Sequence, residues 1–402
     1  TNFRTAGDRH REPAAVTIES PTAKTDETAA ASSGGVDSPK TPASLARSAG
    51  SRMQSLFSQW PGVVVAGGMA VLIAAAYLLV APMGRDLSAQ MAHAQLAESY
   101  WPELLNLRWY GGFNPLGYSV LSPPVMALLG VRLTTALAYV LSVVFFAALL
   151  KVTNMPRPFL GAITGAVCLA GNLVVTRTTF ELALAVGLGA LLALAGGRLW
   201  LASVLSVIAA LTSGVSGLFL GVAGGALFLS GRRRDGITLA VSGMVPTVAV
   251  GVAFGNGGRQ SFAEEHALVG LIVCLAVAGL CWRRPVVRWG ALLSAALVVA
   301  AYLLPTQVGT NATRLPELFG APVIMAVSAV PLAVVIASTI ATALLLPPVS
   351  LTEIQERGDP ALSAQFYAPL LDQLTARGAA GPIEVVATQR RGEAAFVPPV
   401  VP

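Results

Sequence analysis

The sequence predicts an all-α membrane protein: a polytopic bundle of about 10–11 transmembrane helices behind a disordered N-terminal arm. Two features of the composition support this fold class. Hydrophobic residues make up 54% of the 402 residues and charged residues only 11%, whereas a soluble domain carries about 25% charged residues. The mean hydropathy is +0.69. Glycine is abundant as well, with 40 residues, which suits close helix packing in a bilayer.

Residues 1–58 differ in composition from the rest of the chain. They are rich in Ala, Ser, Thr, Pro and charged residues, and such a segment buries too little apolar surface to offset the entropy of ordering. A signal peptide would place its apolar core within about the first 30 residues, but the first apolar run begins near Trp60. We therefore expect residues 1–58 to form a disordered cytoplasmic arm.

Residues 59–347 form the predicted transmembrane domain. About 20 apolar residues cross a bilayer, and the first span runs from Trp60 to Pro82. The later candidates are 133–150, 159–176, 180–196, 199–212, 214–230, 237–254, 267–282, 288–304 and one or two spans within 319–347.

The basic residues predict the orientation. They gather in short loops at 151–157, 232–234 and 283–288, and such loops face the cytoplasm. This placement also favours orientation over nucleic-acid binding as the reason for the net charge of +6. The span count then requires one long external loop, 83–131, in which 120–131 does not cross. We expect a multi-pass plasma-membrane protein with a cytoplasmic N-terminus.

The segment 319–347 determines the side of the C-terminal tail, 348–402. It is long for one upright helix and short for two. Pro331 favours a turn between two short spans, which would place the polar tail outside the cell. A single tilted helix would place the tail inside.

The external loop 83–131 carries the first group of candidate site residues. Aromatic and charged side chains alternate in it, as expected where a ligand is apolar at one end and wet at the other. Asp86 could serve as a general base or ligate a divalent cation bound to a phosphate. The alternatives are a solvated acid and an aromatic anchor at headgroup level. The candidate substrate-binding residues of this loop are Glu98, Arg108, Trp109, Tyr110 and Asn114.

The external segment 306–320 carries the second group. Arg314 could bind a phosphate oxygen, and Glu317 could pair with Arg314 or assist catalysis. The alternative is a surface ion pair in a turn. Arg177 and Glu181, four residues apart at two helix ends, are interpreted as a structural pair.

Several segments resemble a known superfamily. Gly84–Gln90, Gly111–Pro124 and Gly309–Gly320 are similar to parts of an actinobacterial group of large membrane proteins, and the architecture resembles the GT-C glycosyltransferases. The resemblance implies a polyprenyl-phosphate-linked sugar donor, a cell-envelope glycan or lipid acceptor, and Asp86 as catalytic base or part of a metal site. Many members have two acidic residues where this chain has Arg85 and Asp86, so a requirement for Mg or Mn stays open.

The tail pieces Gln365–Leu371 and Glu393–Val397 resemble the beginning of that group's region after the membrane domain. The tail is therefore expected to begin an extracytoplasmic domain. Two alternatives to a glycosyltransferase remain. The many spans would also suit a transporter or lipid flippase, although charged residues are scarce within them. A non-catalytic membrane scaffold is the third hypothesis.

Overall fold

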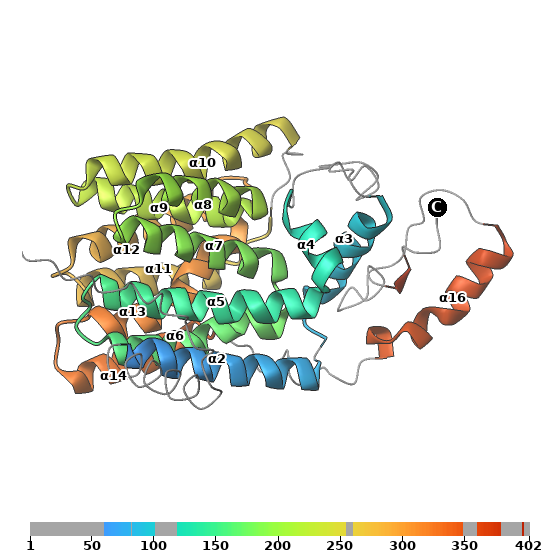
Figure 1. Ribbon diagram of the computed structural model, residues 1–402, viewed down its shortest axis with the longest axis horizontal. Helices are drawn as coiled ribbons and strands as arrows, with labels where there is room; N and C mark the ends of the chain where they lie inside the picture. The colour runs from blue at the N-terminus through green and yellow to red at the C-terminus, as the bar shows by residue number, and fades with distance from the viewer. Residues whose placement is uncertain are drawn as a thin grey trace, which may run out of the picture. The chain divides into compact units, whose positions relative to one another are not determined.

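The computed structural model describes residues 60–81, 83–100, 119–254, 260–348, 360–378 and 396–397. Within these residues every regular element is a helix, so the all-helical class is confirmed (Figure 1). The predicted arm, residues 1–58, lies outside the described residues.

The helices follow the predicted spans closely. Six of the described helices are long and apolar enough to cross a membrane, namely α2, α5, α6, α7, α10 and α12, and α8, α9 and α14 are shorter apolar helices. The bounds are α2 Pro61–Val80, α3 Leu87–Tyr100, α4 Ser122–Leu129, α5 Val131–Val152, α6 Pro158–Val175, α7 Thr178–Ala195, α8 Leu199–Thr212, α9 Gly214–Leu229, α10 Arg233–Phe254, α11 Glu264–Leu280, α12 Pro285–Leu303, α13 Arg314–Val327, α14 Leu332–Leu345 and α16 Ala364–Ala376, with short 3-10 helices at Gly309–Thr313 and Pro360–Leu362.

The surface and the core have the composition of a membrane protein. On α2 the buried side chains include Ala66, Ala70 and Ala74, while Leu79 is 86% exposed. On α10 Val252 is 81% exposed. A water-soluble monomer rarely exposes apolar surface so extensively, whereas in a bilayer small residues pack between helices and large ones face lipid.

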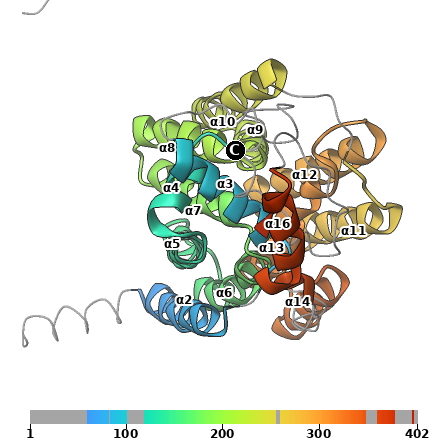
Figure 2. The same ribbon diagram turned by 90° about the vertical axis from the view of Figure 1, so that its right-hand side faces the viewer.

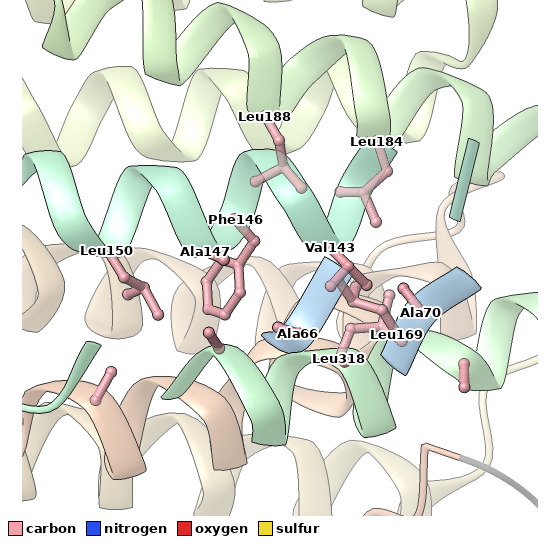
Figure 3. Close-up of a cluster of buried hydrophobic side chains, with 14 of the residues drawn as sticks. Ala66, Ala70, Val143, Phe146, Ala147, Leu150, Leu169, Leu184, Leu188 and Leu318 are labelled. Carbon is pink, nitrogen blue, oxygen red and sulfur yellow. The ribbon is translucent and has the colours of Figure 1, made fainter. Parts of the chain in front are cut away.

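The main core lies where α2, α5, α6, α7 and α13 meet (Figure 3). Phe146 of α5 packs against the ring of Phe319 of α13, with centroids 5.3 Å apart. The labelled core residues are Ala66 and Ala70 of α2, Val143, Phe146, Ala147 and Leu150 of α5, Leu169 of α6, Leu184 and Leu188 of α7, and Leu318 of α13. This core joins helices from both halves of the sequence.

Helices α9 and α10 pack with their backbones in direct contact. A Cβ atom added to Gly236 of α10 would lie 2.5 Å from the backbone N of Phe228 and 2.6 Å from the carbonyl O of Gly224, both on α9. Glycine is therefore the residue that allows this approach.

Helices α5 to α14 alternate in direction along the chain, and α2 runs opposite to α5 (Figure 1). The turns that carry 151–157, 196–198, 230–234 and 281–288 lie at one end of the bundle, called here the basic end. Arg284 donates to the carbonyl O of Asn154 at 3.1 Å, which joins two of these turns. The end with the loop after α2 is called the Asp86 end.

Helices α13 and α14 form the hairpin that Pro331 predicts. Helix α13 runs from the Asp86 end to the basic end, and α14 begins directly after Pro331 and returns. The backbone of Pro348 then lies against Gly171, one turn before the C-terminus of α6. The two-helix interpretation of 319–347 is therefore confirmed, and the chain leaves α14 at the Asp86 end.

Arg157 holds the turn of this hairpin. Its NH1 donates to the carbonyl O of Ser328 at 2.6 Å and its NH2 to that of Val330 at 3.3 Å. We expect Arg157→Ala to lower the free energy of unfolding by about 2 kcal/mol, because two carbonyls lose a charged donor. Heating followed by size-exclusion chromatography of the detergent-solubilised protein measures the loss. Lys151→Ala, an exposed residue at the same end, is the control, and an equal effect of both substitutions would contradict the assignment.

The segment after α2 does not cross the bundle. Helix α4 has only 8 residues and packs with α3 across the ends of α5 and α7 (Figures 1 and 2). Leu87, Ala94, Met126 and Val131 form a small buried cluster there. The expectation that 120–131 does not span is confirmed for its described residues.

The tail contains ordered structure around Tyr367 of α16. This ring is buried, stacks on Phe396 with centroids 5.7 Å apart, and its hydroxyl donates to the carbonyl O of Ala361 at 2.9 Å. Two of the tail motifs singled out in the sequence therefore pack on each other.

Candidate functional site

The loop that carries Asp86 is fixed to the C-terminus of α6. The backbone N–H of Asp86 donates to the carbonyl O of Val175 at 3.1 Å. A Cβ on Gly84 would collide with the carbonyls of Val174 and Val175, so the absence of a side chain at this position allows the loop to lie on the helix end. Asp86 is thereby held where α6 turns into α7.

Arg177 lies between two carboxylates at this turn. Its Nε is 3.8 Å from Oδ2 of Asp86, and its NH1 is 3.5 Å from Oε1 of Glu317. The side chains of Asp86, Arg177 and Glu317 are 32%, 21% and 15% exposed, respectively. The turns after α2 and α6 and the first turn of α13 thus bring one cation and two anions together, partly shielded from solvent.

A second polar layer lies beneath Arg177. Nδ2 of Asn172 donates to Oε2 of Glu181 at 2.7 Å, and NH1 of Arg177 lies 3.5 Å from Oδ1 of Asn172. Both Asn172 and Glu181 are fully buried. A carboxylate in such a position is costly unless it is hydrogen-bonded, and the amide of Asn172 supplies that bond.

Arg314 is the second cation of the site. It opens α13, one turn before Glu317, and its guanidinium carbon lies 4.9 Å from the ring centroid of Phe180 on α7. Phe180 packs edge-on against Phe219 at 6.0 Å. Stacking on an aromatic face orients the guanidinium group of Arg314.

Hydroxyl groups fasten the surrounding helices to the α6–α7 turn. The buried hydrogen bonds that do this include those of Tyr77 with Thr176 at 3.0 Å, Thr135 with Thr178 at 2.6 Å, and Thr179 with Gln90 at 2.8 Å. They link α2, α5 and α3, respectively, to the turn that carries Arg177. These bonds between helices fix the position of the turn that carries Arg177.

The structure brings together only some of the residues predicted from the sequence. Asp86, Arg314 and Glu317 gather at the α6–α7 turn. Glu98 is exposed near the far end of α3, roughly 18 Å along the helix axis from Asp86. The remaining candidates, Arg108, Trp109, Tyr110 and Asn114, lie outside the described residues.

Sequence analysis missed the central residue, Arg177. The four-residue spacing of Arg177 and Glu181 was visible but was interpreted as structural. Glu181 in fact bonds to Asn172, while Arg177 pairs with Glu317, 140 residues away. The sequence does contain one indication of a functional role for Arg177. Arg177 and Glu181 are charged side chains beside otherwise apolar spans, where such residues mark functional sites.

The described residues around Asp86 do not fit a divalent cation. Such an ion needs several oxygen ligands close together, but the guanidinium of Arg177 lies between Asp86 and Glu317. No group of three His, Cys, Asp or Glu side chains suited to a metal occurs in the part of the chain that the structure describes. We derive no step through a metal ion.

His93 of α3 gives the Asp86 end a measurable pH dependence. Burial lowers the pKa of His93 from 6.5 to about 4. The histidine therefore takes up a proton near pH 6.5 in the unfolded chain but only near pH 4 in the folded protein. The free energy of unfolding therefore falls as the pH is lowered from about 6.5 to about 4. At pH 5 the expected loss is about 2 kcal/mol relative to pH 7.

Thermal midpoints at pH 7 and pH 5 check this expectation. His93→Gln should reduce the difference between them, because the buried imidazole is gone. His266→Gln removes an exposed histidine and should leave the difference unchanged. A wild-type pH dependence in His93→Gln would show that other groups cause it.

The apolar outer face and the charged cluster at one end define a helical membrane protein with a polar site where its helices end. Comparisons of this chain with known protein families, with characterised proteins and with solved structures found no match.

Proposed function

We propose that the protein is a GT-C-type membrane glycosyltransferase that moves a sugar from a polyprenyl-phosphate donor to a cell-envelope glycan or lipid acceptor. The observation that carries this proposal is the cluster of Asp86, Arg177 and Glu317 at the Asp86 end. It offers a carboxylate for proton transfer beside a cation for a leaving phosphate. Its place at the ends of apolar helices suits a substrate whose lipid tail lies in the bilayer.

The charge distribution supports an extracytoplasmic site. The basic end carries Lys151, Arg157, Arg198, Arg232, Arg233, Arg234, Arg283, Arg284 and Arg288, with Asp235 as the acidic residue of those turns. Positively charged short loops face the cytoplasm. This orientation places the N-terminus of α2 inside the cell and Asp86 outside, in a multi-pass plasma-membrane protein.

In the proposed reaction Asp86 accepts the proton of an acceptor hydroxyl. The hydroxyl oxygen forms a bond to the anomeric carbon while the bond from that carbon to the lipid phosphate oxygen breaks. The lipid phosphate leaves with the electron pair, and the proton stays on Asp86. General-base assistance of this kind contributes about 10²- to 10⁴-fold to a rate.

Arginine side chains would neutralise the leaving phosphate. Arg314 stacks on the ring of Phe180, and Arg177 already contacts Asp86. Arginine binds phosphate through paired N–H groups, and a fixed cation costs no reorganisation when charge develops. Arg314, and Arg108 of the external loop, are the proposed primary phosphate ligands, and Arg177 is the cation paired with the proposed base, Asp86.

Transfer of labelled sugar from a panel of polyprenyl-phosphate donors, in membranes that contain the protein, tests the proposal. Transfer above that of matched membranes without the protein supports a glycosyltransferase. If no donor in the panel gives transfer, the proposal fails.

One observation favours the alternative of a transporter or lipid flippase. Glu181 is fully buried within α7, and carboxylates inside spans often mark proton or ion pathways. Proteoliposomes that move a labelled polyprenyl phosphate or protons in the wild type, and fail to do so with Glu181→Gln, would support this alternative over sugar transfer.

A further inference from the structure

The backbone of Arg177 is bonded to the two residues that also form the polar layer beneath its side chain. Its N–H donates to the carbonyl O of Asn172 at 2.9 Å, and its carbonyl accepts the N–H of Glu181 at 2.9 Å. Thr176, directly before it, takes the left-handed conformation with φ 60°. The α6–α7 turn therefore sets where the Arg177 side chain starts.

The side chains of Asn172 and Glu181 set where the guanidinium points. Oε2 of the Glu181 carboxyl group accepts a hydrogen bond from the NH₂ end of the Asn172 amide, at 2.7 Å. The carbonyl end of the same amide must then face the other way, toward NH1 of Arg177 at 3.5 Å. The orientation of the Asn172 amide thus depends on Glu181, whose side chain does not itself contact Arg177.

We propose that Asn172 and Glu181 are positioning residues that hold the Arg177 guanidinium between Asp86 and Glu317. Held there, Arg177 separates the two carboxylates and fixes the direction in which Asp86 presents its oxygens. A role of this Arg177 position in sugar transfer rests on the proposed function. The position of Arg177 itself does not depend on that function.

Packing alone does not account for a carboxylate at position 181. Glu181 is fully buried, with Oε2 bonded to the Asn172 amide and the Ser142 hydroxyl beside its carboxyl group. The turn is already secured by the bond between Tyr77 and Thr176. An apolar side chain of similar size would avoid the cost of burying a polar group, so the acceptor that Glu181 provides to Asn172 is its distinguishing contribution.

Chemical modification of Arg177 tests the proposal on the full chain in detergent, without any sugar donor. Phenylglyoxal modifies accessible guanidinium groups, and peptide mass spectrometry gives the rate at Arg177 relative to the exposed Arg232. We expect Asn172→Leu and Glu181→Leu to raise this ratio roughly tenfold, as for the loss of one hydrogen bond to a charged group.

Two further variants separate positioning from general loosening. Glu181→Gln keeps an oxygen that can accept from Asn172, so its ratio should stay near the wild-type value. Ser142→Ala removes a buried hydroxyl beside the Glu181 carboxyl but leaves the path from Glu181 to Arg177 intact, and it should also match the wild type. If the leucine variants do not fold, Asn172→Ser, which cannot reach both partners, carries the same expectation.

Wild-type ratios in the leucine or serine variants would overturn the proposal, and so would an equal rise in Ser142→Ala. The donor panel described above tests the proposed function separately. A protein that shows the expected modification pattern but transfers no sugar would refute the glycosyltransferase and leave the positioning role standing. Sugar transfer together with an unchanged modification ratio would support the glycosyltransferase and refute the positioning role.

Discussion

Asp86→Asn is expected to lower sugar transfer by about 10²- to 10⁴-fold, because the amide has nearly the shape of the acid but cannot take up the acceptor proton. The backbone bond from residue 86 to Val175 does not involve the side chain, so the loop should keep its place. The same labelled donors and membranes used for the wild type measure the change, with protein amount determined by immunoblot.

Asp235→Asn provides the matched control for this substitution. Asp235 also pairs with an arginine, Arg232, at 2.7 Å, but at the basic end. The Asp235→Asn variant should transfer sugar at the wild-type rate. Equal transfer by wild type and Asp86→Asn would remove Asp86 as the base, and a similar loss in both variants would point to a general effect of removing an ion pair.

Gly236→Ala is expected to lower the free energy of unfolding by about 3 kcal/mol, at the upper end of typical overpacking costs. The new methyl group would meet backbone atoms of Gly224 and Phe228 on α9. Backbone atoms cannot move aside as a flexible side chain can, so α9 and α10 must separate and lose contacts along their length. The thermal midpoint of the purified protein measures the effect.

Gly251→Ala tests the same substitution on the same helix. Nothing lies within 4 Å of a Cβ at Gly251, and alanine favours a helix over glycine by about 1 kcal/mol. This variant should be as stable as the wild type or slightly more stable. If both substitutions have the same effect, helix propensity rather than contact with α9 would govern position 236.

The helical framework could be predicted from the sequence because partition into lipid depends on local composition. The predicted span 159–176 corresponds to α6 at Pro158–Val175, and 214–230 to α9 at Gly214–Leu229. Pro331 marked the α13–α14 turn because it disfavours a continuous helix. Such features are properties of about 20 consecutive residues and do not depend on distant contacts.

The candidate site could be predicted only in part. Asp86, Arg314 and Glu317 were recognised as charged residues beside spans, which is again local information. The pairing of Glu317 with Arg177 could not be predicted, because the two residues are 140 positions apart and no periodicity links them. The role of Asn172 depends on the direction of one amide, which becomes visible only when Glu181 and Arg177 are both placed.

The pairing of Arg177 with Glu317 also constrains the order in which the chain assembles. Arg177 is synthesised before Glu317, which follows 140 residues later, roughly 10–30 s at ordinary rates of synthesis. Of the two carboxylates that pair with Arg177, Asp86 is the one already synthesised during that interval. The charge cluster is therefore complete only after α13 has been inserted. Its first residue, Asp86, is synthesised directly after α2, and its last residue, Glu317, is part of α13.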